Sequence, residues 1–314
     1  MVKLQLEFPE GFFDPETRCG HFVSAEMKKI WAVEMDLLAE LLRVCDKHAL
    51  KIFAGGGTML GAVRHKGFIP WDDDIDMIMP RADYNRLCSI ASQEFKEPYF
   101  FQTADSDEGY MKGFAKLINT GTTSMTKEQA ETYIPSCFGI WVDVFPMDQV
   151  VDDEKLFQKQ KDKARRWRRL ASFASDLTTR YGRVRKRKDP VSWLIRLLHP
   201  FLSSFVLEHR LCSKALKKCD ETWQMYNGRP CQMVGDITYS HKPRMLVTDL
   251  AKQVYFPFEH MEIPLCNGWD HALRLQYGDY MEFVKGHPVH AYLIDTDKSY
   301  REYQKEQLSG TLFK

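Results

Sequence analysis

The sequence predicts an α+β fold with α/β-like features, in which helices flank a small mixed β-sheet. Three observations lead to this prediction. Helical periodicity runs through residues 24–48, short apolar segments of strand length lie between residues 50 and 118, and a further apolar run spans residues 139–146. The chain has 314 residues, of which 44% are hydrophobic, so it is long enough to bury a sizeable core.

The expected elements can be placed along the chain from periodicity and length alone. Apolar residues recur at helical spacing in residues 24–48, and residues 82–95 are expected to form another helix. Short apolar runs between polar segments are expected to be strands. The remaining elements are expected as strands at residues 50–53, 99–102, 114–118, 255–258 and 261–265, and as helices at residues 58–63 and 269–277.

Four aspartates stand directly before the apolar run of residues 77–79. In a strand, residues two apart point to the same face. Asp74 and Asp76 are therefore expected side by side, with Asp72 near the strand entrance and Asp73 on the opposite face. Neighbouring carboxylates repel each other and resist burial, so a cation is their natural partner. Mg²⁺, which prefers oxygen ligands and substrate phosphates, fits this pattern.

Three other interpretations of these aspartates compete with a cation site. A solvated acidic turn is the common fate of a charge run. An EF-hand loop requires Gly at its sixth position and Glu at its twelfth, and those places hold Met77 and Asp83. An N-cap for a following helix would need helical periodicity, whereas the next residues are typical of a strand. The cation site explains the pattern better than the last two.

A glycine-rich turn at Gly55, Gly56 and Gly57 precedes the short helix expected from Thr58. A loop that leads into a helix N-terminus can present backbone N–H groups to an anion. The spacing matches neither a Walker A motif nor a dinucleotide-binding fingerprint, so an ordinary tight turn is an equally good interpretation of the glycines alone. Their closeness to the aspartates favours phosphate binding.

A small basic cluster and a tryptophan lie between the glycines and the aspartates. Arg64, His65 and Lys66 could hold a diphosphate or the leaving nucleotide, or they could be the solvated end of a helix, where cations are favoured. Trp71 could stack on a ring of the substrate or pack against the protein. Both alternatives remain open for each group.

Asp143 is the one charged residue within the strand-like run of residues 139–146. Charged residues are seldom buried unless they are paired or bind a ligand, so Asp143 is a candidate third carboxylate. Lys116 lies in another expected strand, where it could bind phosphate or be an exposed strand lysine. Asp148 follows Pro146 and is expected in a turn or at a helix cap.

The motifs together resemble the LicD family, which is also similar to the fukutin group. The resemblance rests on residues 57–76 and is supported by residues 116–118, 122–123, 139–146 and 275–281. It implies a nucleotidyltransferase-type core in which Asp74, Asp76 and Asp143 are the catalytic metal ligands for Mg²⁺, or for Mn²⁺. We expect substrate contacts from Gly56, Gly57, Thr58, Arg64, His65, Lys66, Trp71, Asp72 and Lys116.

The resemblance also implies a chemistry. LicD-like proteins transfer a phospho-substituent, with phosphocholine from CDP-choline as the type case, to a glycan. The expected enzyme is therefore a phosphotransferase that uses a CDP- or CMP-activated donor and a cell-surface glycan or lipid-linked glycan acceptor, as in lipopolysaccharide, teichoic acid or capsule biosynthesis. Two alternatives stay open: a nucleotidyltransferase that acts on a small molecule, and a non-catalytic module that binds nucleotide or glycan.

Charge and composition divide the chain into three parts. We expect a catalytic core at residues 1–158, a basic and partly amphipathic helical insertion at residues 159–225, and a C-terminal part at residues 226–314 that completes the core. The insertion carries cation clusters at residues 165–169 and 183–188 and an apolar stretch at residues 193–202. This pattern suits an anionic membrane surface, a polyanion or a merely solvated appendage.

Composition limits the partners and the compartment. The net charge is +1, so the chain is no polycation, and no nucleic-acid partner is expected. Eight scattered cysteines without a Cys-x-x-Cys pair fit reduced thiols in the cytosol. No signal peptide and no membrane-spanning apolar run is seen. A cytoplasmic protein is expected, with peripheral contact to the inner face of the membrane through residues 159–218 as an option.

Overall fold

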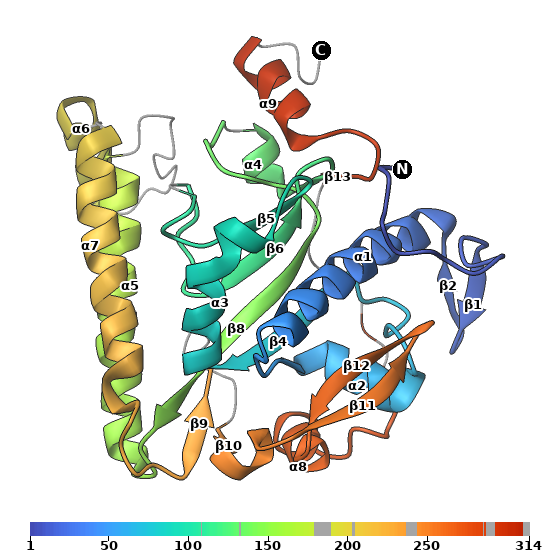
Figure 1. The fold of residues 1–314 in the computed structure, drawn as a ribbon. Helices are drawn as coiled ribbons and strands as arrows, with labels where there is room; N and C mark the ends of the chain where they lie inside the picture. The colour runs from blue at the N-terminus through green and yellow to red at the C-terminus, as the bar shows by residue number, and fades with distance from the viewer. Residues whose placement is uncertain are drawn as a thin grey trace.

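The central feature of the fold is a mixed β-sheet (Figure 1). The computed structural model describes residues 1–107, 109–131, 133–178, 190–202, 205–236, 244–284, 286 and 293–309. Within them the sheet has seven strands in the order β10-β9-β8-β4-β3, with β6 paired to β8 and β5 paired to β6. Its strands are β3 (Phe53–Ala54), β4 (Ile75–Pro80), β5 (Tyr99–Gln102), β6 (Ala115–Asn119), β8 (Trp141–Val150), β9 (Met233–Gly235) and β10 (Met245–Leu246).

Strand β8 is the central strand of the sheet. It pairs in parallel with β4 and antiparallel with β6, so apolar residues on both of its sides are buried. The register sets Asp76 of β4 opposite Asp143, and Lys116 of β6 opposite the same Asp143. Three charged residues therefore lie in a row across three neighbouring strands.

Strand β8 is longer than the sequence predicts, because it continues past Pro146 to Val150. The expectation that Asp148 lies in a turn or at a cap is wrong. Asp148 is a fully buried strand residue, and the guanidinium of Arg81 donates to both of its carboxylate oxygens. A proline does not end this strand, and the buried ion pair explains how an aspartate can occupy its interior.

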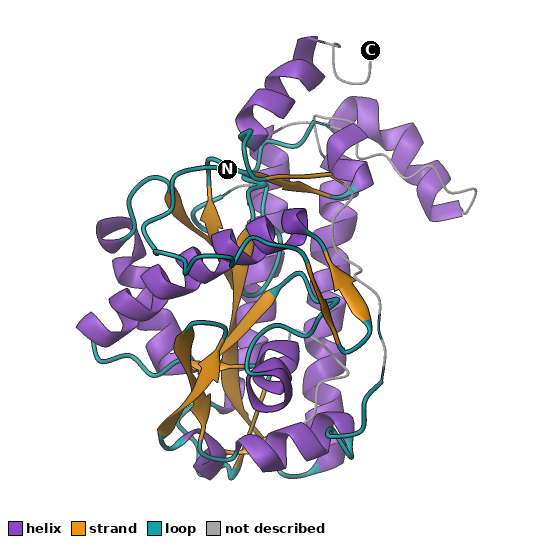
Figure 2. Cartoon of the chain, turned by 90° about the vertical axis from the view of Figure 1, so that its right-hand side faces the viewer, coloured by secondary structure: helices purple, strands orange, loops and turns teal. Residues whose placement is uncertain are grey.

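Helices pack around the sheet (Figure 2). Helix α1 (Ala25–Lys47) begins at Ser24, whose hydroxyl accepts from the N–H of Met27, and it packs on β6 and β8. Helix α3 (Arg81–Glu94) follows β4 directly and packs on β4, β5 and β8. Helix α2 (Gly56–His65) packs on β4. This packing of helices on a mixed sheet confirms the α+β fold class predicted from the sequence.

The C-terminal part adds a hairpin and a short helix next to α2. The hairpin of β11 (Gln253–Phe258) and β12 (Met261–Cys266) contacts α2 and β3. Helix α8 (Trp269–Tyr277) ends at Gly278, whose positive φ of 65° explains why glycine stands there. Smaller elements are β1 (Glu16–Arg18), β2 (His21–Val23), β7 (Thr123–Met125), α4 (Lys127–Glu131), the 3₁₀ helices η1 (Gln224–Tyr226) and η2 (Val247–Leu250), β13 (Leu293–Asp295) and α9 (Tyr300–Ser309).

A helical arm stands on one side of the sheet (Figure 1). It consists of α5 (Glu154–Thr178), α6 (Pro190–Leu202) and α7 (Phe205–Trp223), with α5 and α7 packed along each other. After the arm, β9 pairs antiparallel with the end of β8, so the chain returns to the central sheet. The predicted basic cluster at residues 183–188 lies outside the described residues. Within the part of the chain that is described, no helix combines the length and apolar character needed to cross a bilayer.

Candidate functional site

The row of Asp76, Asp143 and Lys116 forms the centre of the candidate site. Residues directly opposite each other on paired strands point to the same face of the sheet. The Nζ of Lys116 lies 3.4 Å from Oδ1 of Asp143, which is within ion-pair range, and both side chains are buried. The same Oδ1 has no hydrogen-bond partner among the described residues. A buried carboxylate oxygen in this state is a ready position for a ligand.

Lys116 is held at this place by Trp141 as well as by Asp143. Its Nζ lies 3.3 Å from the centroid of the Trp141 ring, a cation–π contact at short range. Burial lowers the pKa of Lys116 to about 7, while the negative charge of Asp143 acts in the opposite direction. The exposed-lysine interpretation is therefore excluded, and Lys116 faces the acidic residues from the sheet.

The remaining aspartates precede the strand instead of lying in it. Strand β4 begins at Ile75, so the alternation of faces does not extend back to Asp73. The prediction that Asp73 points away from its neighbours is wrong: Asp72, Asp73 and Asp74 each offer a carboxylate oxygen, and these oxygens lie within 4.8 Å of one another. All three are partly exposed. We call this segment, residues 72–74, the acidic loop.

The glycine turn brings the N-terminus of α2 against the carboxylates. A Cβ on Gly56, whose φ is 48°, would lie 3.1 Å from Oδ2 of Asp76, and a Cβ on Gly57 would lie 2.6 Å from Oδ2 of Asp72. The Asp76 N–H donates to Oγ1 of Thr58 at 2.8 Å. A side chain at Gly56 or Gly57 would push the carboxylate of Asp76 or Asp72 out of its position. The negative charge of these carboxylates is also stabilised by the positive end of the α2 dipole.

The basic cluster lies at the other end of α2, roughly 12 Å along the helix axis from Gly56. Arg64 donates to the backbone carbonyls of Tyr280 and Glu282 and so fixes the loop after α8. Burial, followed by the charge of Arg64, lowers the pKa of His65 to about 4, so His65 is neutral at pH 7. Lys66 is exposed and has a left-handed backbone. These contacts favour a structural role for Arg64 and His65.

Trp71 is packed into the protein. It is buried, its ring centroid lies 5.3 Å from that of Phe283, and it also meets the ring of His21. A Cβ on Gly286 would lie 2.4 Å from its Nε1. The packing interpretation of Trp71 fits these contacts better than stacking on a substrate ring.

Two residues at the site were not predicted as functional from the sequence. Tyr277 of α8 has its hydroxyl 3.9 Å from the position of a Gly56 Cβ, and burial together with Asp76 and the acidic loop raises its pKa. Glu34 of α1 is buried, and after burial the strongest charges that raise its pKa are those of Asp74 and Asp73. In the sequence, Glu34 is marked only by being a glutamate among the apolar residues of one helix face.

Helix α1 also positions the acidic loop through its backbone. The indole Nε1 of Trp31 donates to the carbonyl of Asp72 at 2.8 Å. The Trp31 ring in turn stacks on Phe68, with centroids 4.6 Å apart. Because Trp31 is fully buried, the loop is tied to the core and is not a freely solvated turn.

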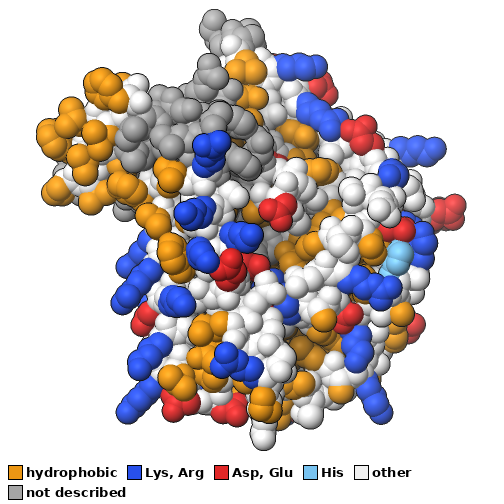
Figure 3. Space-filling model, turned by 60° about the vertical axis from the view of Figure 1, so that its left-hand side comes forward, with side chains coloured by type: hydrophobic (Ala, Val, Ile, Leu, Met, Phe, Trp, Pro, Cys, Tyr) orange, Lys and Arg blue, Asp and Glu red, His pale blue; other side chains and the backbone are white. Residues whose placement is uncertain are grey.

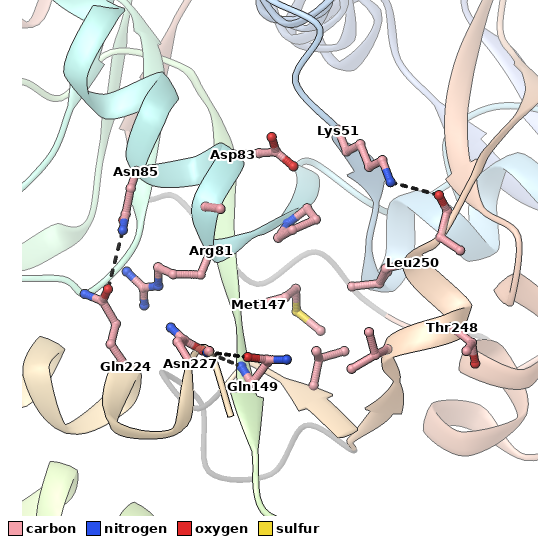
Figure 4. A pocket seen from close by; sticks show the side chains of 16 residues that line it. Lys51, Arg81, Asp83, Asn85, Met147, Gln149, Gln224, Asn227, Thr248 and Leu250 are labelled. Carbon is pink, nitrogen blue, oxygen red and sulfur yellow. Dashed lines mark hydrogen bonds between the residues drawn. The ribbon is translucent and has the colours of Figure 1, made fainter. Parts of the chain in front are cut away.

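A separate cavity of about 650 Å³ lies farther along the same strands (Figure 4). Pro80 and Met147, which are opposite each other in the register, line it together with Arg81 and the amide side chains of Gln149 and Asn227. Its volume is in the range of small-molecule sites. It lies beyond the carboxyl-terminal end of β4, whereas the acidic loop lies at the start of this strand.

Comparison with known proteins shows a similarity that includes most of this site. The family described as "LicD/FKTN/FKRP, nucleotidyltransferase domain" matches residues 49–169. These residues therefore resemble a LicD-family domain. The chain is also similar to the lipopolysaccharide cholinephosphotransferase LicD of Haemophilus influenzae, with 28% identity over 254 residues that cover 79% of this chain and 88% of the relative.

The LicD-family domain contains the glycine turn, the acidic loop, Asp76, Lys116 and Asp143. Glu34 precedes it and Tyr277 follows it, so the site draws on elements at both sides of the domain. Two uncharacterised proteins, of Rickettsia prowazekii and Rickettsia typhi, are 39% and 38% identical to the chain over only 57 and 61 residues. These shorter matches add no information on activity.

Proposed function

We propose that the protein is a phosphotransferase that moves a phospho-substituent, phosphocholine or a related head group, from a CDP- or CMP-activated donor to a hydroxyl of a cell-surface glycan or its lipid-linked precursor. The LicD-family domain and the similarity to a lipopolysaccharide cholinephosphotransferase support a phosphotransferase. The observation that carries the proposal is the pairing of Asp76 with Asp143 on one face of the sheet, beside the acidic loop.

The donor set of the site fits Mg²⁺, which prefers oxygen ligands. Asp74, Asp76 and Asp143 would hold the ion, and Oδ1 of Asp143, which lies near Nζ of Lys116 but accepts no hydrogen bond from the described residues, is one candidate ligand oxygen. When bound, a divalent cation neutralises charge on a diphosphate and stabilises the departing nucleotide. Mn²⁺, which has similar oxygen chemistry, is the alternative ion.

The side chains around the carboxylates would position the substrates. Lys116, set against Asp143 by the Trp141 ring, is placed to interact with a phosphate oxygen. A carboxylate of the site can accept the proton that leaves the acceptor hydroxyl. Phosphoryl transfer depends mainly on positioning and on stabilisation of negative charge, so this small group of side chains suffices for the chemistry.

The test is a thermal-shift panel followed by product analysis. With Mg²⁺ present, CDP-choline, CDP-ethanolamine, CDP-ribitol and CMP-phosphonates are added in turn, and the bound donor is expected to raise the melting temperature by mass action. Release of CMP from this donor, together with labelling of a glycan acceptor, would support the proposal. Metal-dependent binding of a donor without any product would instead indicate a non-catalytic binding module.

The nucleotidyltransferase description of the domain favours one second candidate, nucleotidyl transfer from a nucleoside triphosphate to a small molecule. The two activities differ in their products, because nucleotidyl transfer releases pyrophosphate whereas transfer of a phospho-substituent releases CMP. Pyrophosphate release from CTP would therefore replace the first proposal with the second.

The end of the helical arm is the proposed contact with an anionic membrane. One side of α6 exposes Val191, Trp193, Leu194, Leu197 and Phe201, with Phe201 84% exposed. Figure 3 shows hydrophobic side chains gathered at this end of the molecule and Lys and Arg side chains along the arm. An apolar helix face beside basic residues is typical of peripheral binding to anionic lipid. A lipid-linked acceptor would be met at such a surface.

Replacing two of these side chains is expected to weaken membrane contact. The double variant Trp193→Glu with Leu197→Glu should bind vesicles of phosphatidylglycerol and phosphatidylcholine at least about tenfold more weakly than the unchanged protein. It removes apolar area that the lipid would bury, and it adds negative charge that the anionic lipid repels. Flotation of the vesicles measures binding. Phe22→Glu, at an exposed phenylalanine on β2, is the matched control and should float normally. Failure of the unchanged protein to float excludes membrane docking.

A further inference from the structure

Glu34 has no explanation in the packing of α1. Its neighbours along the helix, Ala32, Val33 and Met35, are fully buried apolar residues, and Glu34 itself is 2% exposed. Its Oε2 has no hydrogen-bond partner among the described residues. Burying a carboxyl group without a hydrogen-bond partner costs free energy, and glutamate is rarely found fully buried unless it is paired. A functional reason for Glu34 is therefore expected.

The surroundings of Glu34 point toward the acidic loop. A cavity of about 10 Å³ is lined by Glu34 and Asp73, with Ser124 and Trp141 completing its polar wall. This is about the space that one water molecule or one small ion occupies. The charges that act on Glu34 are those of Asp74, Asp73, Asp72 and Asp143, in falling order, which agrees with its place beside Asp73 at this cavity.

We propose that Glu34 and the acidic loop hold a divalent cation at a site separate from the pair of Asp76 and Asp143. The inference rests on the proposed function, since it adds a second cation to the same catalytic centre. The loop alone supplies three carboxylates whose oxygens lie within 4.8 Å of one another. Glu34 lies outside this close group, but its unpartnered oxygen belongs to a side chain that lines the small cavity together with Asp73, and from there it would supply a fourth carboxylate from a different element of the fold.

The geometry explains why the fourth carboxylate comes from α1. The same helix holds the acidic loop through the hydrogen bond from Trp31 to the carbonyl of Asp72, and Glu34 follows Trp31 by three positions, on the same side of the helix. A cation bound between Glu34 and Asp73 would join the helix to the loop. Oxygen-rich sites of this kind suit Mg²⁺ and Mn²⁺. Asp74 would belong to both cation sites. The second cation would therefore hold the acidic loop where Asp74 can also bind the cation of Asp76 and Asp143.

A buried water is the competing occupant of the cavity. The indole N–H of Trp141 lines it and also has no hydrogen-bond partner among the described residues. One water could accept from Trp141 and donate to Glu34, with Glu34 protonated. Water and cation predict different effects of an amide at position 34, because glutamine can still accept from a water but loses the charge that binds a metal ion.

The test counts Mn²⁺ ions bound to the full chain by electron paramagnetic resonance. The unchanged protein is expected to bind two ions, Glu34→Gln should weaken one of them at least about tenfold, and Asp143→Asn should weaken the other. Glu40→Gln, at a glutamate of the same helix that pairs with Arg43, is the matched control and should bind two ions normally. Mn²⁺ should also raise the melting temperature of Glu34→Gln less than that of the control.

Each other outcome overturns the inference in a recognisable way. Two ions of unchanged affinity in Glu34→Gln would assign the cavity to water. A single ion weakened by both Glu34→Gln and Asp143→Asn would mean one site instead of two; in both cases the proposed function stands. No bound ion in the unchanged protein would remove the metal from the proposed function as well. If Glu34→Gln does not fold, Glu34→Met, which keeps the length of the side chain, replaces it.

Discussion

Replacing Asp76 or Asp143 with asparagine is expected to lower the rate of phospho-substituent transfer at least about 10²-fold. Asparagine keeps the shape of the side chain but removes the negative charge that would hold the metal ion, and without the ion the charge on the diphosphate is not neutralised. The same loss is expected for Asp74→Asn. The rate of CMP release from the donor that stabilises the protein most in the thermal-shift panel is the measurement.

Stability separates this effect from damage to the fold. Asp76 and Asp143 are opposite each other on neighbouring strands, so like-charge repulsion is relieved when either is made neutral. The metal-free Asp76→Asn variant should therefore melt no lower than the unchanged protein, whereas in Asp143→Asn this gain is offset by the loss of the ion pair with buried Lys116. Asp152→Asn, at an exposed aspartate just after β8, is the control and should keep full activity. Activity retained in both Asp76→Asn and Asp143→Asn would exclude these carboxylates from catalysis.

The regular elements of the core could be predicted because local pattern and tertiary packing agree there. Helix α1 follows the helical periodicity of its apolar residues, strand β5 is a short apolar run, and α8 ends at a glycine with positive φ. The length of β8 could not be predicted. Asp148 looks like a turn residue until Arg81, 67 positions earlier, is seen to neutralise it.

The candidate site was predictable only where its residues are close in sequence. The aspartates of residues 72–76 and the glycine turn form one short motif, and Asp143 stands out because it is charged within an apolar strand. The orientation of Asp73 depended on where β4 begins, which alternation alone does not fix. Glu34 and Tyr277 reach the site through the packing of α1 and α8, and a single sequence carries no direct signal of such contacts.

The ion pair of Arg81 and Asp148 connects three parts of the molecule. Arg81 begins α3, Asp148 lies in β8, and the Nη1 of Arg81 also donates to Asp220 of α7 at 3.1 Å. Asn227 donates to Asp148 from the segment that follows the helical arm. The side chains of Arg81 and Asp148 are 7% and 1% exposed. The pair therefore fastens the helical arm and the start of α3 to the central sheet.

Asp148→Asn is expected to lower the free energy of unfolding by about 3–5 kcal/mol, because it leaves the guanidinium of Arg81 buried without its main counter-charge. Urea unfolding followed by circular dichroism measures this change. Asp220→Asn removes a half-exposed partner of the same arginine and should cost about 1 kcal/mol or less. Combining Arg81→Met with Asp148→Leu should recover much of the loss, since an apolar pair can replace a buried ion pair. A loss below about 1 kcal/mol in Asp148→Asn would show that the arm is fastened to the sheet by other contacts, in the first place by the pairing of β8 with β9.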